Sequence, residues 1–285
     1  MAADLHFHSI YSDGNNTPAE LIEMAISKGI DTVALSDHDT VEGVAEMIEI
    51  GNEKGVEVIP AIEFSTYQGE VEMHILGYYI DYRSKTFLSK IHSLFRERIA
   101  RSRKMVKKLN DIGININYQD VVKTAGDKYV GRPHIARAMI SAGYINNIEE
   151  AFTEDYIGNR GKAYVSKDNL SPLEAIELIH KAGGIAVLAH PYLINDGAPF
   201  DKNGIINLAN QGLEGIEVFH SKQSQEISEY YLKIARELDL LVTGGSDFHG
   251  NGSVGLQLGD VLLDDQYVAQ LKDFYNRKYG TPSGK

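Results

Sequence analysis

The chain has 285 residues, a formal net charge of −12, 43% hydrophobic residues and no cysteine. This length allows one large α/β barrel or two smaller domains, and the lack of cysteine excludes disulfides, thiolate metal sites and iron–sulfur clusters. The acidic charge argues against stable binding of duplex nucleic acid, and the absence of a signal peptide or a long apolar run predicts a cytoplasmic protein without membrane contact.

The sequence opens with a predicted strand that carries two histidines, His6 and His8, two residues apart. Side chains alternate along a strand, so both imidazoles point to the same side. Asp13 follows in a Ser-Asp-Gly turn and could supply a carboxylate to the same place. Imidazole is a common ligand of catalytic metals, but a pair of surface histidines would give the same pattern.

Alternating helices and strands are predicted up to residue 83. The first helix begins at Pro18, because Thr17 can cap it, proline suits the first helical position and Glu20 completes a capping box. The further predicted elements are a strand over residues 31–35, a helix over 40–54, a strand over 56–62 that ends at Glu63, and a strand over 70–80 that contains His74. This order is typical of a parallel α/β fold.

Residues 84–165 interrupt the alternation. A long basic helix is predicted over residues 86–110, and shorter helices follow through residue 151. The segment contains 15 Lys and Arg residues against eight Asp and Glu residues, whereas the rest of the chain contains 13 against 32. We expect a helical insertion that is either an ordinary solvated basic surface or a cap facing an anionic substrate.

The α/β pattern resumes after residue 165 with a second capping box at residues 171–174. Strands are predicted over residues 185–189, 213–219, 240–243 and 260–263, and helices over residues 223–238 and 265–279. The predicted organisation is therefore a barrel body, residues 1–83 and 166–285, into which a helical cap domain, residues 84–165, is inserted.

A histidine or a carboxylate stands at or just after the end of nearly every predicted strand. The carboxyl ends of parallel barrel strands share one face, where catalytic groups gather. The residues in these positions are His6, His8, His38, Glu63, His190, His220, Asp247 and His249. Satisfied core histidines would explain one or two such positions but not the whole set, so the pattern predicts a metal centre.

This set, with its local motifs, resembles the PHP (polymerase and histidinol phosphatase) superfamily. The matching motifs are His6-x-His8, Asp13, Ser36-Asp37-His38-Asp39, Glu63, His74, Ala189-His190-Pro191 and Ser246-Asp247-x-His249. The Gly131-Arg132-Pro133-His134 segment resembles the subgroup of small nucleotide phosphatases and short-RNA 5′-exonucleases. The resemblance implies a distorted (β/α)7 barrel with an inserted helical cap domain and three divalent metal ions, which could be Mn, Fe or Zn.

Carried over position by position, the resemblance assigns ligands to each ion. One ion would be held by His6, His8, Glu63 and Asp247, a second by Glu63, His74 and His190, and a third by Asp13, His38 and His249. His220 matches no ligand position and is either a supporting residue beside the ligands or a structural one.

The implied activity is that of a metal-dependent phosphoesterase in which a metal-bound water attacks the phosphate. The expected substrate is a phosphorylated small molecule, a nucleotide (a nucleoside monophosphate or 3′,5′-bisphosphate) or a short oligonucleotide shortened from its 5′ end. Arg132 is expected to grip a phosphate, and His134 to donate a hydrogen bond or protonate the leaving oxygen. Further candidate contacts are Arg160 and Lys162 near the barrel mouth, and Ser246 bonded to a ligand carboxylate or phosphate. The alternative for Arg132, Arg160 and Lys162 is that each is an ordinary surface cation without a role in substrate binding.

Three other functions fit parts of the pattern. A histidinol-phosphate phosphatase belongs to the same superfamily, although a substrate with a cationic amine suits a basic cap less well. An amidohydrolase-type enzyme also opens with His-x-His in a barrel, but it holds one or two metals and acts on C–N or ester bonds. A degenerate metal-binding module without activity is the non-enzymatic alternative.

Overall fold

The computed structural model describes residues 2–69, 71–125, 130–166, 170–195, 198–250 and 255–280. Its strands are β1 (Ala2–Phe7), β2 (Thr32–Leu35), β3 (Glu57–Gln68), β4 (Val71–Tyr78), β5 (Ile185–Leu188), β6 (Gly215–His220), β7 (Leu241–Gly245) and β8 (Leu263–Asp264). Its helices are α1 (Pro18–Ser27), α2 (Val44–Lys54), α3 (Lys85–Asp111), α4 (Tyr118–Thr124), α5 (Arg132–Ser141), α6 (Ile148–Ala151), α7 (Pro172–Lys181), α8 (Lys202–Asn210), α9 (Gln225–Glu237) and α10 (Asp265–Tyr279). Both predicted capping boxes are present, at the starts of α1 and α7.

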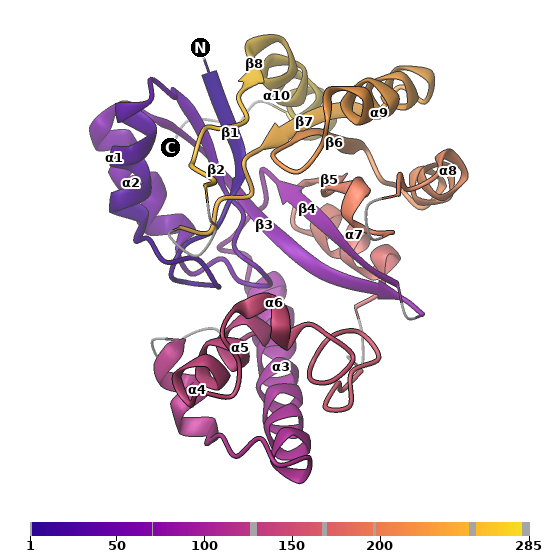
Figure 1. The fold of residues 1–285 in the computed structure, drawn as a ribbon. Coiled ribbons are helices and arrows are strands. Elements are labelled where there is room, and N and C mark those ends of the chain that lie inside the picture. The colour runs from indigo at the N-terminus through magenta and orange to yellow at the C-terminus, as the bar shows by residue number, and fades with distance from the viewer. Residues whose placement is uncertain are drawn as a thin grey trace.

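The eight strands form one sheet in the order β7-β6-β5-β4-β3-β2-β1-β8. The end of β7 returns to β1 and nearly closes the sheet, because Asp247 donates its amide to the His6 carbonyl (2.7 Å) and His8 donates to the Phe248 carbonyl (2.9 Å). Helices surround this sheet on the outside (Figure 1). The predicted barrel-like α/β fold is thereby confirmed.

Two strands run against the predicted parallel arrangement, the short edge strand β8, which pairs antiparallel with β1, and β4 in the middle of the sheet. β4 is antiparallel to both β3 and β5, and Ser65 of β3 pairs with His74 of β4. A short hairpin connection suffices for antiparallel neighbours, whereas a parallel pair needs a crossover. β3 ends at Gln68 and β4 begins at Val71, and Gly69 adopts a φ of 64° that favours glycine. Because β4 is reversed, its beginning lies at the carboxyl ends of the parallel strands and carries His74 there.

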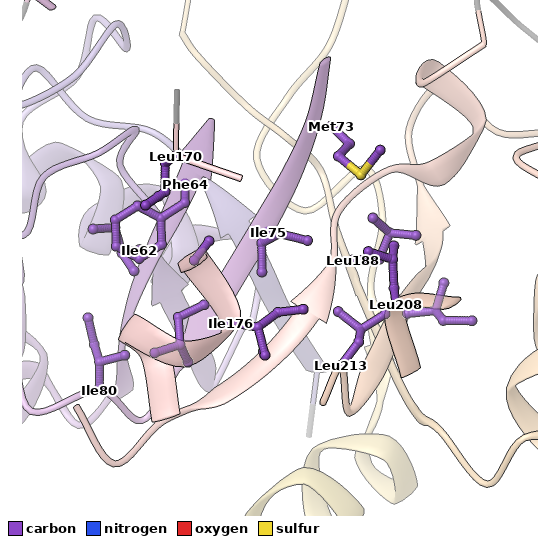
Figure 2. Close-up of a cluster of buried hydrophobic side chains, with 14 of the residues drawn as sticks. Ile62, Phe64, Met73, Ile75, Ile80, Leu170, Ile176, Leu188, Leu208 and Leu213 are labelled. Carbon is purple, nitrogen blue, oxygen red and sulfur yellow. The ribbon is translucent and has the colours of Figure 1, made fainter. Parts of the chain in front are cut away.

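The largest buried cluster lies between the strands and the helices around them. Ile75 of β4 and Leu188 of β5 face Ile176 of α7, and Ile62 of β3 belongs to the same cluster (Figure 2). These apolar contacts fix the central strands, and with them the residues at the strand ends.

Helix α3 joins this core to a second one. Its first half contributes Phe87, Ile91 and Leu94 to the cluster of Figure 2. Its second half packs Met105 and Leu109 into a separate cluster whose members all come from residues 105–163. The segment from α3 to α6 gathers beyond one end of the barrel, where the long strands β3 and β4 also extend (Figure 1). Within the described ranges, no helix is long and apolar enough to cross a membrane.

We predict that Ile176→Ala lowers the free energy of unfolding by about 2–5 kcal/mol, because it leaves a cavity in the cluster of Figure 2. The matched control is Leu173→Ala in the same helix, whose side chain is 41% exposed and should cost less than about 1 kcal/mol. Urea unfolding followed by circular dichroism measures both, and equal losses would contradict this account of the core.

Candidate active site

The two histidines of β1 meet two carboxylates from distant strands. His6 Nε2 lies 3.2 Å and His8 Nε2 lies 3.3 Å from Glu63 Oε2. The same two nitrogens lie 3.5 and 3.2 Å from Asp247 Oδ1. Asp247 follows β7, so the contact that closes the barrel also brings its side chain to β1. The structure thus brings together the four residues that the sequence assigns to one ion.

Glu63 lies at the centre of a larger group. Its Oε1 is 2.8 Å from His74 Nδ1 and 2.9 Å from His190 Nε2, while its Oε2 is 3.1 Å from His38 Nδ1. One carboxylate therefore faces imidazoles from several strands with both oxygens. Both oxygens are therefore directed at potential metal ligands on two sides.

The third predicted group also converges, with one addition. Asp13 Oδ1 lies 3.4 Å from His249 Nε2, and its Oδ2 lies 3.9 Å from His38 Nε2. His8 joins them, since one ligand atom from each of the four residues lies within 4.8 Å of the others. Arg137 of α5 donates to the Asp13 carbonyl (3.2 Å), so the helical segment contacts this turn directly.

The cluster contains buried atoms that suit a bound cation. Among the described residues, several buried polar atoms find no hydrogen-bond partner, namely His6 Nε2, His8 Nδ1, Asp13 Oδ1, His38 Nδ1 and Glu63 Oε2. Buried polar atoms are normally satisfied, and imidazole nitrogens with carboxylate oxygens are the donor set of Mn, Fe and Zn sites. The residues present therefore fit divalent ions.

The central carboxylates are ionised, as ligands must be. Burial by itself raises the pKa of Glu63, but the charges of His38, His6 and His74 outweigh this effect and hold that pKa well below its usual value. Asp247 shows the same balance, in which His249 and His6 lower the pKa of a buried carboxyl.

A carboxylate that the sequence analysis did not single out supports the histidines. Glu217 of β6 is fully buried, accepts from His6 Nδ1 (2.9 Å) and accepts from the backbone amide of His190 (2.7 Å). The bond at Nδ1 leaves His6 Nε2 directed at Glu63 and Asp247. The sequence contains a signal that could have identified Glu217. It is a glutamate within a largely apolar predicted strand, and a charged side chain is rarely buried without a partner.

His220 contacts the cluster from the same strand. Its Nε2 lies 3.3 Å from Asp247 Oδ2, and its Nδ1 accepts from the amide of Lys222 (3.2 Å). Of the two roles left open by the sequence, the supporting one agrees with these contacts.

A cleft of about 1240 Å³ opens over the cluster. One wall carries His38, Glu63, His74, His190, Asp247 and His249. The facing wall comes from the helical segment and includes Lys104, Arg132 and Arg160. A smaller cavity of about 120 Å³ lies beside it, where Arg98, Arg101 and Arg132 face Asp13 and His38.

Arg132 is at the cleft, as predicted, but it is ion-paired. Its Nη2 donates to Glu72 Oε2 (2.6 Å), its Nη1 donates to Asn159 Oδ1 (2.9 Å), and its guanidinium lies 5.3 Å from the centre of the Phe152 ring. Glu72 in turn lies 3.7 Å from His74 Nε2. Neither this link nor the ion pair between Arg98 of α3 and Asp39 was predicted from the sequence.

The remaining candidate contacts differ in their positions. Arg160 lines the cleft, whereas Lys162 is exposed, pairs with Asp155 (2.7 Å) and is not among the residues that line the cleft. Ser246 has no accessible surface and its amide donates to Asp4 Oδ1 (2.9 Å), so a substrate phosphate cannot reach its hydroxyl in this structure.

His134 lies at the start of α5 and is almost fully buried. It is 2% exposed, and its Nδ1 accepts from the Gly131 amide (3.1 Å) at the start of α5. Burial, as the largest effect, lowers the pKa of His134 to about 4. The ring is therefore neutral at pH 7, and because Nδ1 accepts, its proton is on Nε2, where it can still donate a hydrogen bond. The role of His134 toward the substrate stays a prediction.

Comparison with known sequences gives consistent matches. Residues 4–237 match the profile of the PHP domain family. The chain is 34% identical to a 5′-3′ exoribonuclease of Haemophilus influenzae, over 86% of this chain and 89% of that protein. It is 30% identical to a 3′,5′-nucleoside bisphosphate phosphatase of Chromobacterium violaceum, over 90% of each. A phosphoribosyl 1,2-cyclic phosphate 1,2-diphosphodiesterase of Eggerthella lenta is 28% identical, over 88% of this chain and 95% of that protein.

Two solved structures are similar along nearly the whole chain. A proposed metal-dependent phosphoesterase from Bifidobacterium adolescentis superposes with a TM-score of 0.86 at 33% identity, covering 94% of each chain. A protein from Chromobacterium violaceum described as an amidohydrolase, solved with bound sulfate and no metal, superposes with a TM-score of 0.82 at 30% identity, covering 92% and 91%.

We predict that Glu217→Gln weakens metal binding by roughly 10- to 100-fold, because the neutral amide holds His6 less strongly in its ligating form. Glu214→Gln is the matched control, since Glu214 pairs with His180 and Lys278 and takes no part in the cluster. Metal content after dialysis against graded chelator measures the effect. Equal retention in the wild type and both variants would show that Glu217 does not support a metal site.

Proposed function

The chain belongs to the PHP domain family, and we propose that it hydrolyses phosphate esters of nucleotides or removes nucleotides from the 5′ end of short RNA. Membership in this family makes it a metal-dependent phosphoester hydrolase. The observation that supports the proposal best is the cluster around Glu63, which opens into a cleft whose opposite wall is basic.

In this proposal the cluster holds three divalent ions. The ligands are His6, His8, Glu63 and Asp247 for one ion, Glu63, His74 and His190 for the second, and Asp13, His38 and His249 for the third. When bound, such ions lower the pKa of water and neutralise phosphate oxygens during an in-line displacement. The donor set suits Mn, Fe or Zn.

The other residues of the site orient these ligands and the substrate. Glu217 fixes the ring of His6, and His220 contacts the second oxygen of Asp247. Arg132 binds a phosphate oxygen at Nη1, where the substrate replaces Asn159, while Glu72 keeps Nη2 in place. Residues 84–165 act as the cap domain that supplies this cation to the barrel, residues 1–83 and 166–285.

Two rival functions remain to be tested against this one. A histidinol-phosphate phosphatase would use the same metal cluster, but the cleft wall with Lys104, Arg132 and Arg160 would repel a substrate with a cationic amine. An amidohydrolase function is favoured by the description of the similar Chromobacterium violaceum structure. That reading requires one or two ions per chain rather than three.

Metal-loaded protein should release phosphate from AMP or adenosine 3′,5′-bisphosphate, or mononucleotides from a 5′-phosphorylated RNA, in preference to histidinol phosphate. Glu63→Gln should lower kcat by at least about 100-fold, because the shared carboxylate is lost. Glu57→Gln, at the exposed start of the same strand, should retain full activity. A wild type that acts only on histidinol phosphate or on amides would contradict the proposed substrate class.

Arg132→Ala should raise the KM for a phosphorylated substrate by roughly tenfold, because one charge-assisted contact is removed, and should leave the metal content unchanged. The exposed Arg236→Ala in α9 is the control for loss of a positive charge. Kinetics and metal analysis are measured on the same preparations. Loss of metal from Arg132→Ala would mean that Arg132 acts through Glu72 and His74 as a structural residue.

A further inference from the structure

The phosphate that reacts needs one binding site at the candidate metal cluster, but the basic wall of the cleft extends well beyond that cluster. Arg98 and Arg101 of α3 line the small cavity next to Asp13 and His38. Lys104, Lys107 and Lys108, further along the same helix, line the large cleft. A basic row thus leads away from the candidate metal cluster.

The lysines of this row are available to a ligand. Lys104 and Lys107 are exposed and have no ion-pair partner among the described residues. The two acidic residues of that wall, Asp111 and Glu154, are paired with neither of them in the described contacts. Lys108 is held by the carbonyl of Tyr164 (2.7 Å) and keeps its charge at the cleft.

The spacing of the row suits a chain of phosphates. Arg101, Lys104 and Lys108 stand three and four residues apart and share one helix face. At 1.5 Å per residue, each step advances by about 4.5–6 Å along the helix. A single nucleotide would occupy only the beginning of such a row, and the cleft of about 1240 Å³ exceeds what a small ligand usually fills.

The row continues over the helix into a second groove. Lys107 lines both the large cleft and a groove of about 520 Å³ that contains Arg103 and Tyr118. The guanidinium of Arg103 lies 5.0 Å from the centre of the Tyr118 ring. Cations along a groove with an aromatic ring are how proteins bind single-stranded nucleic acid without reading its sequence.

We propose that Lys104, Lys107 and Lys108 form a track that binds the backbone phosphates of a single-stranded oligonucleotide whose 5′ end lies at the metal cluster. This inference rests on the proposed function and narrows it, because it makes the enzyme favour oligonucleotides over single nucleotides. The nucleotides on the 3′ side of the first one would follow α3 toward Tyr118.

The test compares Lys104→Ala/Lys107→Ala with the wild type on adenosine 3′,5′-bisphosphate and on 5′-phosphorylated oligoadenylates of two and eight nucleotides. The double variant should lose roughly tenfold in kcat/KM on the eight-mer and little on the bisphosphate. The dependence of log Kd on log salt for the eight-mer should become shallower by about 1.4, as expected for two lost phosphate contacts on a single strand. Lys181→Ala/Lys233→Ala, two exposed lysines on α7 and α9, removes the same charge elsewhere and should behave as the wild type.

The outcomes separate the track from the activity. Equal loss on the bisphosphate and the eight-mer, or no loss on either, would overturn the track. If the wild type hydrolyses none of the substrates, the proposed function fails. In that case the track is still tested by the fluorescence anisotropy of an eight-mer labelled at its 3′ end. Lys104→Ala/Lys107→Ala should bind this eight-mer more weakly than the wild type does, whereas the control double variant should bind it with the same Kd as the wild type.

Discussion

The buried carboxylate of Glu63 is the group on which the rest of the site depends. Both of its oxygens face imidazoles, from His38, His74 and His190 as well as from the two histidines of β1. A charge without solvent is stable only if opposite charges or cations surround it. The five imidazoles meet part of this requirement. The closure of β7 against β1 adds a second, largely buried carboxylate, Asp247, beside the same two histidines of β1, and this excess of negative charge suits bound cations.

The helical segment is coupled to this point by charge. Arg98 pairs with Asp39, which follows His38, and Arg132 pairs with Glu72, which lies next to His74. Arg137 reaches the backbone of Asp13. Three arginines thus contact the three parts of the barrel that carry the outer ligand candidates. Each of these contacts is direct, so the helical segment and the residues around the candidate metal ligands are in contact at three separate points.

Much of this arrangement could be predicted because it depends on local patterns. The capping boxes in the sequence predicted where α1 and α7 begin. The histidines that follow several strands predicted that their side chains meet at one end of the barrel. The reversal of β4 could not be read in this way, since an apolar strand has the same pattern in either direction. Helix α8 was not predicted; it begins after an Asp201 cap, and Gly204 in its first turn obscures the helical pattern. The ion pairs of Arg98 and Arg132 join residues about 60 positions apart in the sequence. The spacing of apolar residues predicts helices and strands but not a contact between two such distant side chains.

Helix α3 is continuous from the barrel core into the core of the helical segment. A sharp kink would break backbone hydrogen bonds and pull Phe87 and Leu94 or Met105 and Leu109 out of their clusters. The orientation of the basic residues of α3 relative to the barrel strands is therefore set by side-chain packing at both ends of one continuous helix.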